Sequence, residues 1–218
     1  MIVIKKQLLA RTIVGMAFFV VIFMALRTVR ADGVVGTGTP DSCTDDAFDA
    51  AVKAGGSITF NCGTAPVAIN VLKEKDVTGS VNINGGGKVT LNGRNRARLF
   101  RVATGATLTL QELTLAYAAA NGAGNGDGGG NGAGVLNEGG TVVITDTTIT
   151  ASRAEEGGGA VYNKGTGTIS LIRTTLSNNT AGTNGGGLGN EAGQVMLANV
   201  TFSGNFAANK GGGVYDDT

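Results

Sequence analysis

The sequence predicts an all-β fold, a right-handed parallel β-helix (a solenoid) with about 26 residues per coil and a short N-terminal capping helix. Three observations predict it: a Gly-rich motif at a fixed spacing, columns of aliphatic residues that return with it, and a helix-compatible segment before the first strand. The motif copies end at Asn137, Asn163, Asn190 and Asp216. Such a constant period is typical of solenoids, whose units bury their apolar faces only by stacking.

The segment 1–31 predicts export. Lys5, Lys6 and Arg11 precede an apolar run over residues 13–26, and small residues lead up to Ala31. This pattern is typical of a secretory signal peptide cut after Ala31. The alternative is an N-terminal membrane anchor, although the run is shorter than the roughly 18 residues of a membrane span. We therefore expect a secreted or cell-surface (outer-membrane) protein that contacts a membrane only if this segment stays uncleaved.

The next segment is expected to close the start of the solenoid. Residues 32–42 are rich in Gly, Thr and Asp and predict a flexible lead-in. Thr44 can cap the first N–H groups of a helix that Gly55 ends, and this helix would cover the open apolar end of the first coil. Cys43 and Cys62 are the two cysteines of the chain, and an exported protein with two cysteines predicts one disulfide.

The β-helix domain is expected to span residues 43–218, as a run of short strands separated by Gly-rich turns. The first strands are expected at Ser57–Phe60, Val67–Val71, Val81–Ile83, Val89–Leu91, Leu99–Val102 and Thr107–Leu110. Three inward columns follow from aligning the repeat: Leu108, Val142, Ile169 and Val195; Leu110, Ile144, Leu171 and Leu197; and Leu115, Ile149, Leu176 and Phe202. The first step in each column is longer than the later ones, which predicts a bulge over Asn121–Asn131.

The C-terminal copy of the motif stops at Asp216, just before the last residue of the sequence, Thr218. The repeat is therefore expected to have been truncated at this end. An unfinished coil exposes unpaired backbone N–H and C=O groups, which favours end-to-end association.

Two polar columns accompany the aliphatic ones. The amide column at the turns is expected to be structural, because stacked Asn side chains hydrogen-bond along the stack. A second column faces outward from the strands and forms a flat hydroxyl surface that resembles the faces of ice-binding β-solenoids. Its members are Thr148, Thr150, Thr175, Ser177, Thr201 and Ser203. The alternative is that Thr simply favours exposed strand positions.

Several short motifs resemble a known family. The segments 158–161 (Gly-Gly-Ala-Val) and 202–205 (Phe-Ser-Gly-Asn) are similar to the GGA[ILV] and FxxN repeats of bacterial polymorphic outer-membrane proteins, and segments 176–179, 186–188 and 212–214 are variants. The wider group is the exported β-helix proteins with the pectin-lyase-like fold. This resemblance implies a surface-exposed module with an adhesive or structural role.

Composition excludes some functions. The net charge is +1, so no strong field attracts nucleic acid. There is no His, so the commonest near-neutral acid–base group and metal ligand is missing. We expect no nucleic-acid partner, no catalytic residues, no metal ligands and no cofactor. The Gly/Asn-rich segment around Asp127 is only a faint match to a Ca²⁺-binding repeat.

The function expected is a non-enzymatic secreted or cell-surface module with an adhesive, structural or ligand-binding role, toward carbohydrate or a host-surface ligand. The alternative is a polysaccharide lyase or hydrolase, or a remnant of one, which would need clustered carboxylates. The acidic residues are not expected to cluster. An exposed ion ladder is expected at Glu138, Lys164, Glu191 and Asp217. The third possibility is the ice-binding surface. Tyr162 and Tyr215, two coils apart, could stack on sugars.

Overall fold

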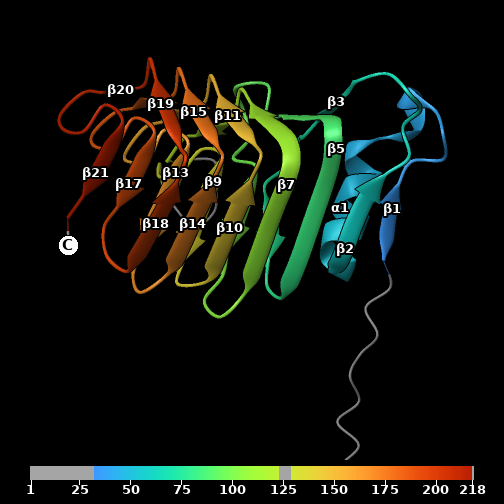
Figure 1. Cartoon of the computed structure of the whole chain (residues 1–218), viewed down its shortest axis with the longest axis horizontal. Coiled ribbons are helices and arrows are strands. Elements are labelled where there is room, and N and C mark those ends of the chain that lie inside the picture. Colours follow the sequence, from blue (N-terminus) through green and yellow to red (C-terminus); the bar gives the residue numbers. More distant parts are fainter. Residues whose placement is uncertain (1–31, 123–128, 218) are drawn as a thin grey trace, which may run out of the picture.

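A computed structural model describes residues 32–122 and 129–217, which stack as successive coils in chain order (Figure 1). The strands pair in parallel throughout the described part, in about seven turns of about 26 residues. This confirms the parallel β-solenoid that the sequence predicts. Three sheets run along the axis of the stack.

The sheets are numbered here by decreasing size. Sheet 1 holds β1 (Gly33–Val35), β2 (Gly56–Phe60), β3 (Val67–Asn70), β5 (Ser80–Asn92), β7 (Thr107–Ala116), β10 (Thr141–Thr145), β11 (Thr148–Thr150), β14 (Thr168–Ile172), β15 (Thr175–Ser177), β18 (Gln194–Ala198) and β19 (Thr201–Ser203). Sheet 2 holds β4 (Lys75–Val77), β6 (Phe100–Val102), β9 (Val135–Glu138), β13 (Val161–Lys164), β17 (Leu188–Asn190) and β21 (Val214–Asp216). Sheet 3 holds β8 (Ala119–Ala120), β12 (Arg153–Ala154), β16 (Thr180–Ala181) and β20 (Phe206–Ala207).

The N-terminal end of the stack is closed as expected. Helix α1 (Asp45–Ala54) begins after Thr44, whose hydroxyl oxygen accepts a hydrogen bond from the Ala47 N–H at 3.2 Å. Phe48 on this helix is fully buried, and α1 packs against β1, β2 and β4 (Figure 1). The Cys43–Cys62 disulfide is present and confirms the predicted bridge.

The segment 32–42 differs from the prediction of a flexible lead-in. Residues Gly33–Val35 form β1 and pair in parallel with β2, and Pro40–Ser42 form a 3₁₀ turn. The prediction is wrong because Val35 is 1% exposed and joins the core, so the solenoid already begins here. The proposed signal peptide or anchor, residues 1–31, lies outside the described residues. Within residues 32–122 and 129–217, no helix is long and apolar enough to cross a membrane.

The interior follows the predicted columns residue by residue. The first column, for example, pairs Leu108 with Val142, Val142 with Ile169, and Ile169 with Val195. The turn column also pairs in register, and its buried amides form a ladder. Asn137 Nδ2 donates to Asn163 Oδ1 at 2.9 Å, and Asn163 Nδ2 donates to Asn190 Oδ1 at 2.8 Å.

A second buried ladder was not predicted. Asn179 Nδ2 donates to Asn205 Oδ1 at 3.0 Å, and the Ser152 N–H donates to Asn179 Oδ1, also at 3.0 Å. Asn205 is the Asn of the FxxN motif and is half-buried, and Asn179 holds the same place one coil earlier and is fully buried. The repeat therefore carries two hydrogen-bonding columns and not one.

Candidate binding surfaces

The outer face of sheet 2 brings together side chains from six successive coils. Its central outward column consists of Asp76, Arg101, Leu136, Tyr162, Gly189 and Tyr215. Neighbouring positions of a parallel sheet lie about 4.8 Å apart, so the column is a continuous line along the solenoid axis. It combines charged and aromatic side chains with a glycine and with Leu136, which is fully buried.

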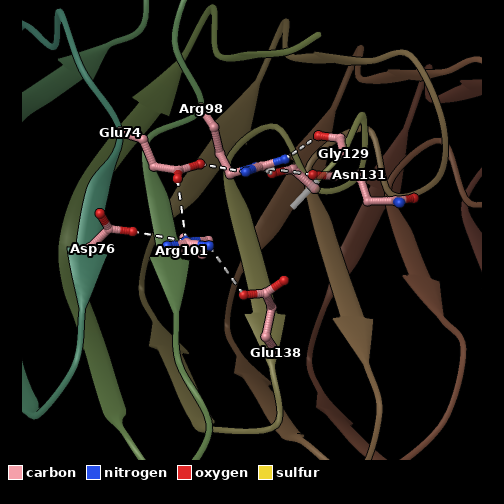
Figure 2. A network of polar contacts seen from close by, with 8 residues as sticks. Glu74, Asp76, Arg98, Arg101, Gly129, Asn131 and Glu138 are labelled. Carbon is pink, nitrogen blue, oxygen red and sulfur yellow. Dashed lines mark hydrogen bonds and ion pairs between the residues drawn. The ribbon is translucent and has the colours of Figure 1, made fainter. Parts of the chain in front are cut away.

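Three carboxylates surround Arg101 at one end of this face (Figure 2). The Arg101 Nε lies 2.8 Å from Asp76 Oδ1 and 3.4 Å from Glu74 Oε1, and its Nη1 lies 3.6 Å from Glu138 Oε2. The expectation that the acidic residues do not cluster is therefore wrong. It failed because β4 was not predicted: this strand lies before the regular repeat, where the spacing of the motif gives no register.

Arg98 lies beside this cluster and is fully buried. Its guanidinium contacts Glu74 and donates to three backbone carbonyls, those of Gly129 (2.6 Å), Asn131 (3.1 Å) and Gly132 (3.2 Å) (Figure 2). A planar arginine fork suits several fixed acceptors at once. Arg98 therefore fastens the end of the long connection between β8 and β9 to the outer face of sheet 2.

The cluster leaves little room for acid–base chemistry. Burial raises the pKa of Glu74, and the Arg98 charge opposes this shift. The Arg101 guanidinium contacts both Asp76 and Glu138, and so fills the space where a hydrolase holds the scissile bond between two carboxylates. Among the described residues, no group of three Asp, Glu, Cys or His side chains could hold a metal ion. Asp127, in the faint Ca²⁺ match, lies outside them.

The middle of the face carries an aromatic platform. The Tyr162 ring lies over two glycines: a methyl group at Gly189 would be 2.7 Å from Tyr162 Cδ2, and one at Gly157 would be 2.6 Å from Cε2. The backbone beneath the ring is close enough that only glycine fits at both positions. The Cδ2–Cε2 edge of the ring is therefore held against the glycine backbone, and the Tyr162 side chain is half exposed.

The hydroxyl groups of Tyr162 and Tyr215 both lie close to carboxylates, those of Glu191 and Asp217. Tyr162 Oη lies 3.5 Å from Glu191 Oε2, and the Tyr215 hydroxyl donates to Asp217 Oδ1 at 2.8 Å. Burial and the nearby negative charge of Glu191 raise the pKa of Tyr162 to about 12. Lys164 lies in register with Glu138, but in the described part Glu138 forms its ion pair with Arg101 and Glu191 contacts the Tyr162 hydroxyl, so the expected ion ladder is not formed.

The predicted hydroxyl surface lies on a different face, the outer side of sheet 1. The structure aligns Thr148 with Thr175 and Thr175 with Thr201, and it aligns the second column likewise. Within that second column the Ser177 hydroxyl is 2.9 Å from Thr150 Oγ1. The first column also continues to Thr114 and Thr90, which the repeat alignment missed because their strand segments are parts of the longer β7 and β5.

The fold and these outer faces define a parallel β-solenoid protein. Comparisons with protein-family models, with curated proteins and with solved structures gave no match to the chain. The likeness to polymorphic outer-membrane repeats and to the pectin-lyase-like group therefore rests on the short motifs of segments 158–161 and 202–205 and their variants alone.

Proposed function

We propose that the protein is a non-enzymatic extracellular module that binds an extended carbohydrate along the outer face of sheet 2. The observation that carries the proposal is the half-exposed Tyr162 ring, which is held in place by Gly157 and Gly189 and bordered by Glu191. Aromatic rings offer an apolar surface to the faces of sugar rings, and carboxylates and tyrosine hydroxyls offer hydrogen bonds to their hydroxyl groups. The disulfide and the repeat motifs favour an extracellular, adhesive setting.

A linear ligand suits the geometry of this face. Tyr162 and Tyr215 lie two coils apart in one column, with Gly189 between them, so the two rings follow the solenoid axis. The spacing of two coils is about 9.6 Å. A chain of sugar units laid along the axis would contact both rings.

The test is binding of the purified protein to an array of soluble and insoluble polysaccharides. For a polysaccharide that binds, Tyr162→Ala should weaken binding about tenfold, which is about 1.4 kcal/mol. Tyr117→Ala is the matched control, because Tyr117 is 47% exposed but lies at a corner of sheet 1. Absence of any polysaccharide binding, or equal loss in the two variants, would refute the proposal.

The carboxylate cluster supports an enzymatic alternative, hydrolysis of a polysaccharide by Asp76 and Glu138. Arg101 between these carboxylates counts against it. The alternative requires release of reducing ends from the bound polysaccharide, with loss of that release in Asp76→Asn and in Glu138→Gln. Binding without release excludes it.

The five-threonine column of sheet 1 supports a second alternative, binding to ice. A rigid row of hydroxyl and methyl groups at constant spacing could hold ordered water. The measurement is thermal hysteresis, which Thr175→Lys should abolish and Tyr162→Ala should leave intact, because Tyr162 is on the other face. No hysteresis at high protein concentration excludes this alternative.

A further inference from the structure

Lys75 occupies a position that the solenoid otherwise gives to apolar residues. It points inward from β4 in register with Phe100, which is fully buried, and Val77 on the same strand is 1% exposed. Lys75 itself is 1% exposed. Burial of an ammonium group is unfavourable even when the group is paired, so its presence at the end of the core calls for a physical reason.

The ammonium lies against the first turn of α1. Lys75 Nζ is 2.7 Å from Asp45 Oδ1 and 3.4 Å from Asp49 Oδ1, and it is 5.9 Å from the centre of the Phe48 ring. Despite this proximity, Lys75 Nζ and Asp45 Oδ1 have no hydrogen-bond partner of acceptable geometry within the described part of the chain. Two reactive groups are thus held in contact, buried and poorly hydrogen-bonded.

The other oxygen of the same carboxyl group is engaged. Asp45 Oδ2 accepts a hydrogen bond from the Leu72 N–H at 3.2 Å. This contact fixes the orientation of the carboxyl group, turns Oδ1 toward Lys75, and places an N–H donor on the oxygen that would carry negative charge if Nζ attacked the carboxyl carbon. Contact at this distance in a fixed orientation is what accelerates an intramolecular reaction.

We propose that Lys75 Nζ and the side-chain carboxyl of Asp45 condense into an amide that covalently joins β4 to α1. Asp49 takes a proton from the Lys75 ammonium, and the free amine attacks Asp45 Cγ. The Cγ–Oδ1 bond breaks, and Oδ1 leaves as water with two protons that came from the ammonium. Ammonium and carboxylate give amide and water, so the step balances without any oxidant, reductant or other reactant.

The product removes the unfavourable feature of the site. Two buried charges become one neutral amide, whose oxygen is Oδ2 and still accepts from Leu72. Together with the disulfide that precedes Asp45 at Cys43, the amide fastens the capping helix to the first coils at two points. Such a cap resists opening at the end of the stack where the core would otherwise be exposed.

The test is peptide mapping of the folded full-length protein after reduction, denaturation and trypsin digestion. We expect the peptide that ends at Lys53 to be joined to the peptide of residues 74–88, lighter than the two together by one water, with no cleavage after Lys75. Asp45→Asn should form the same link with loss of ammonia in place of water, because the leaving group is then the side-chain amide nitrogen. Asp49→Asn should lower the linked fraction at least tenfold.

The matched control is Lys53→Met, which removes the exposed partner of Asp49 and should leave the link intact. Free cleavage after Lys75 in folded wild-type protein, with the intact mass of the unreacted chain, would overturn the proposal. This readout uses the wild-type protein, so it remains decisive even if a variant at Lys75 fails to fold.

Discussion

Replacing Asn163 with alanine tests the buried amide ladder at its centre. The Asn163 side chain is fully buried and makes contacts in both directions along the stack. Its Nδ2 donates to Asn190 Oδ1 at 2.8 Å, to the Gly167 carbonyl at 2.9 Å and to the Ala192 carbonyl at 3.0 Å. Its Oδ1 accepts from Asn137 Nδ2 at 2.9 Å. Asn163→Ala removes all four hydrogen bonds.

The expected loss follows from the groups that keep no partner. Asn137 Nδ2 still donates to the Gly140 carbonyl, and Ala192 is half exposed, so water can reach its carbonyl. The Gly167 carbonyl still accepts from the Gln194 N–H at 3.0 Å. The Asn190 Oδ1 oxygen remains buried and loses its donor, at about 1–3 kcal/mol. The free energy of unfolding should therefore fall by about 2 kcal/mol, compared with the about 5–15 kcal/mol typical of a folded domain.

The assay is urea unfolding followed by circular dichroism, with the free energy taken from midpoint and slope. Lys164→Ala is the control, because Lys164 is the next residue but is exposed, and its replacement should change stability by less than about 0.5 kcal/mol. A loss below about 1 kcal/mol for Asn163→Ala would refute the reasoning, since the ladder would then be replaceable by water or by local rearrangement.

Three other outcomes are expected. Replacing Cys43 and Cys62 with serine should lower the free energy of unfolding by about 3 kcal/mol, measured by urea unfolding, because the sequence separation of 19 no longer restricts the unfolded chain. The wild-type protein should lose stability as pH rises from about 10 to about 12, because unfolded Tyr162 ionises first whereas its pKa in the fold is about 12, and Tyr162→Phe should reduce this loss. Gly189→Ala should displace the Tyr162 ring, because the added methyl group would lie 2.7 Å from Cδ2, and weaker polysaccharide binding with unchanged folding would show it.

The repeated half of the fold could be predicted to single-residue register. Aliphatic residues such as Ile144 and Leu171 recur at the period of the turn motif, so aligning one fixes the other. Period and register are properties of the sequence alone, because in a parallel solenoid each coil pairs with the next along the chain. The same reasoning placed Thr148 beside Thr175.

The N-terminal half and the charged cluster could not be predicted in this way. Lys75 breaks the apolar pattern at an inward position, so β4 went unrecognised, and with it the contact of Asp76 with Arg101. The apolar periodicity also does not predict that Arg98 is buried. Its burial depends on the backbone carbonyls to which it donates, such as that of Gly132. The signal for both is a charged residue at or just before the start of a short strand, which hydrophobic patterning discards.

The unequal length of the coils has an evolutionary consequence. Leu108 pairs directly with Val142, and Val142 pairs directly with Ile169 in the same column, although the first of these two coils is the longer one. Extra residues at one corner thus leave the neighbouring coils undisturbed. Peripheral segments can be gained, lost or exchanged at that corner while the core is inherited unchanged. Such an architecture allows different segments to be displayed on the same framework.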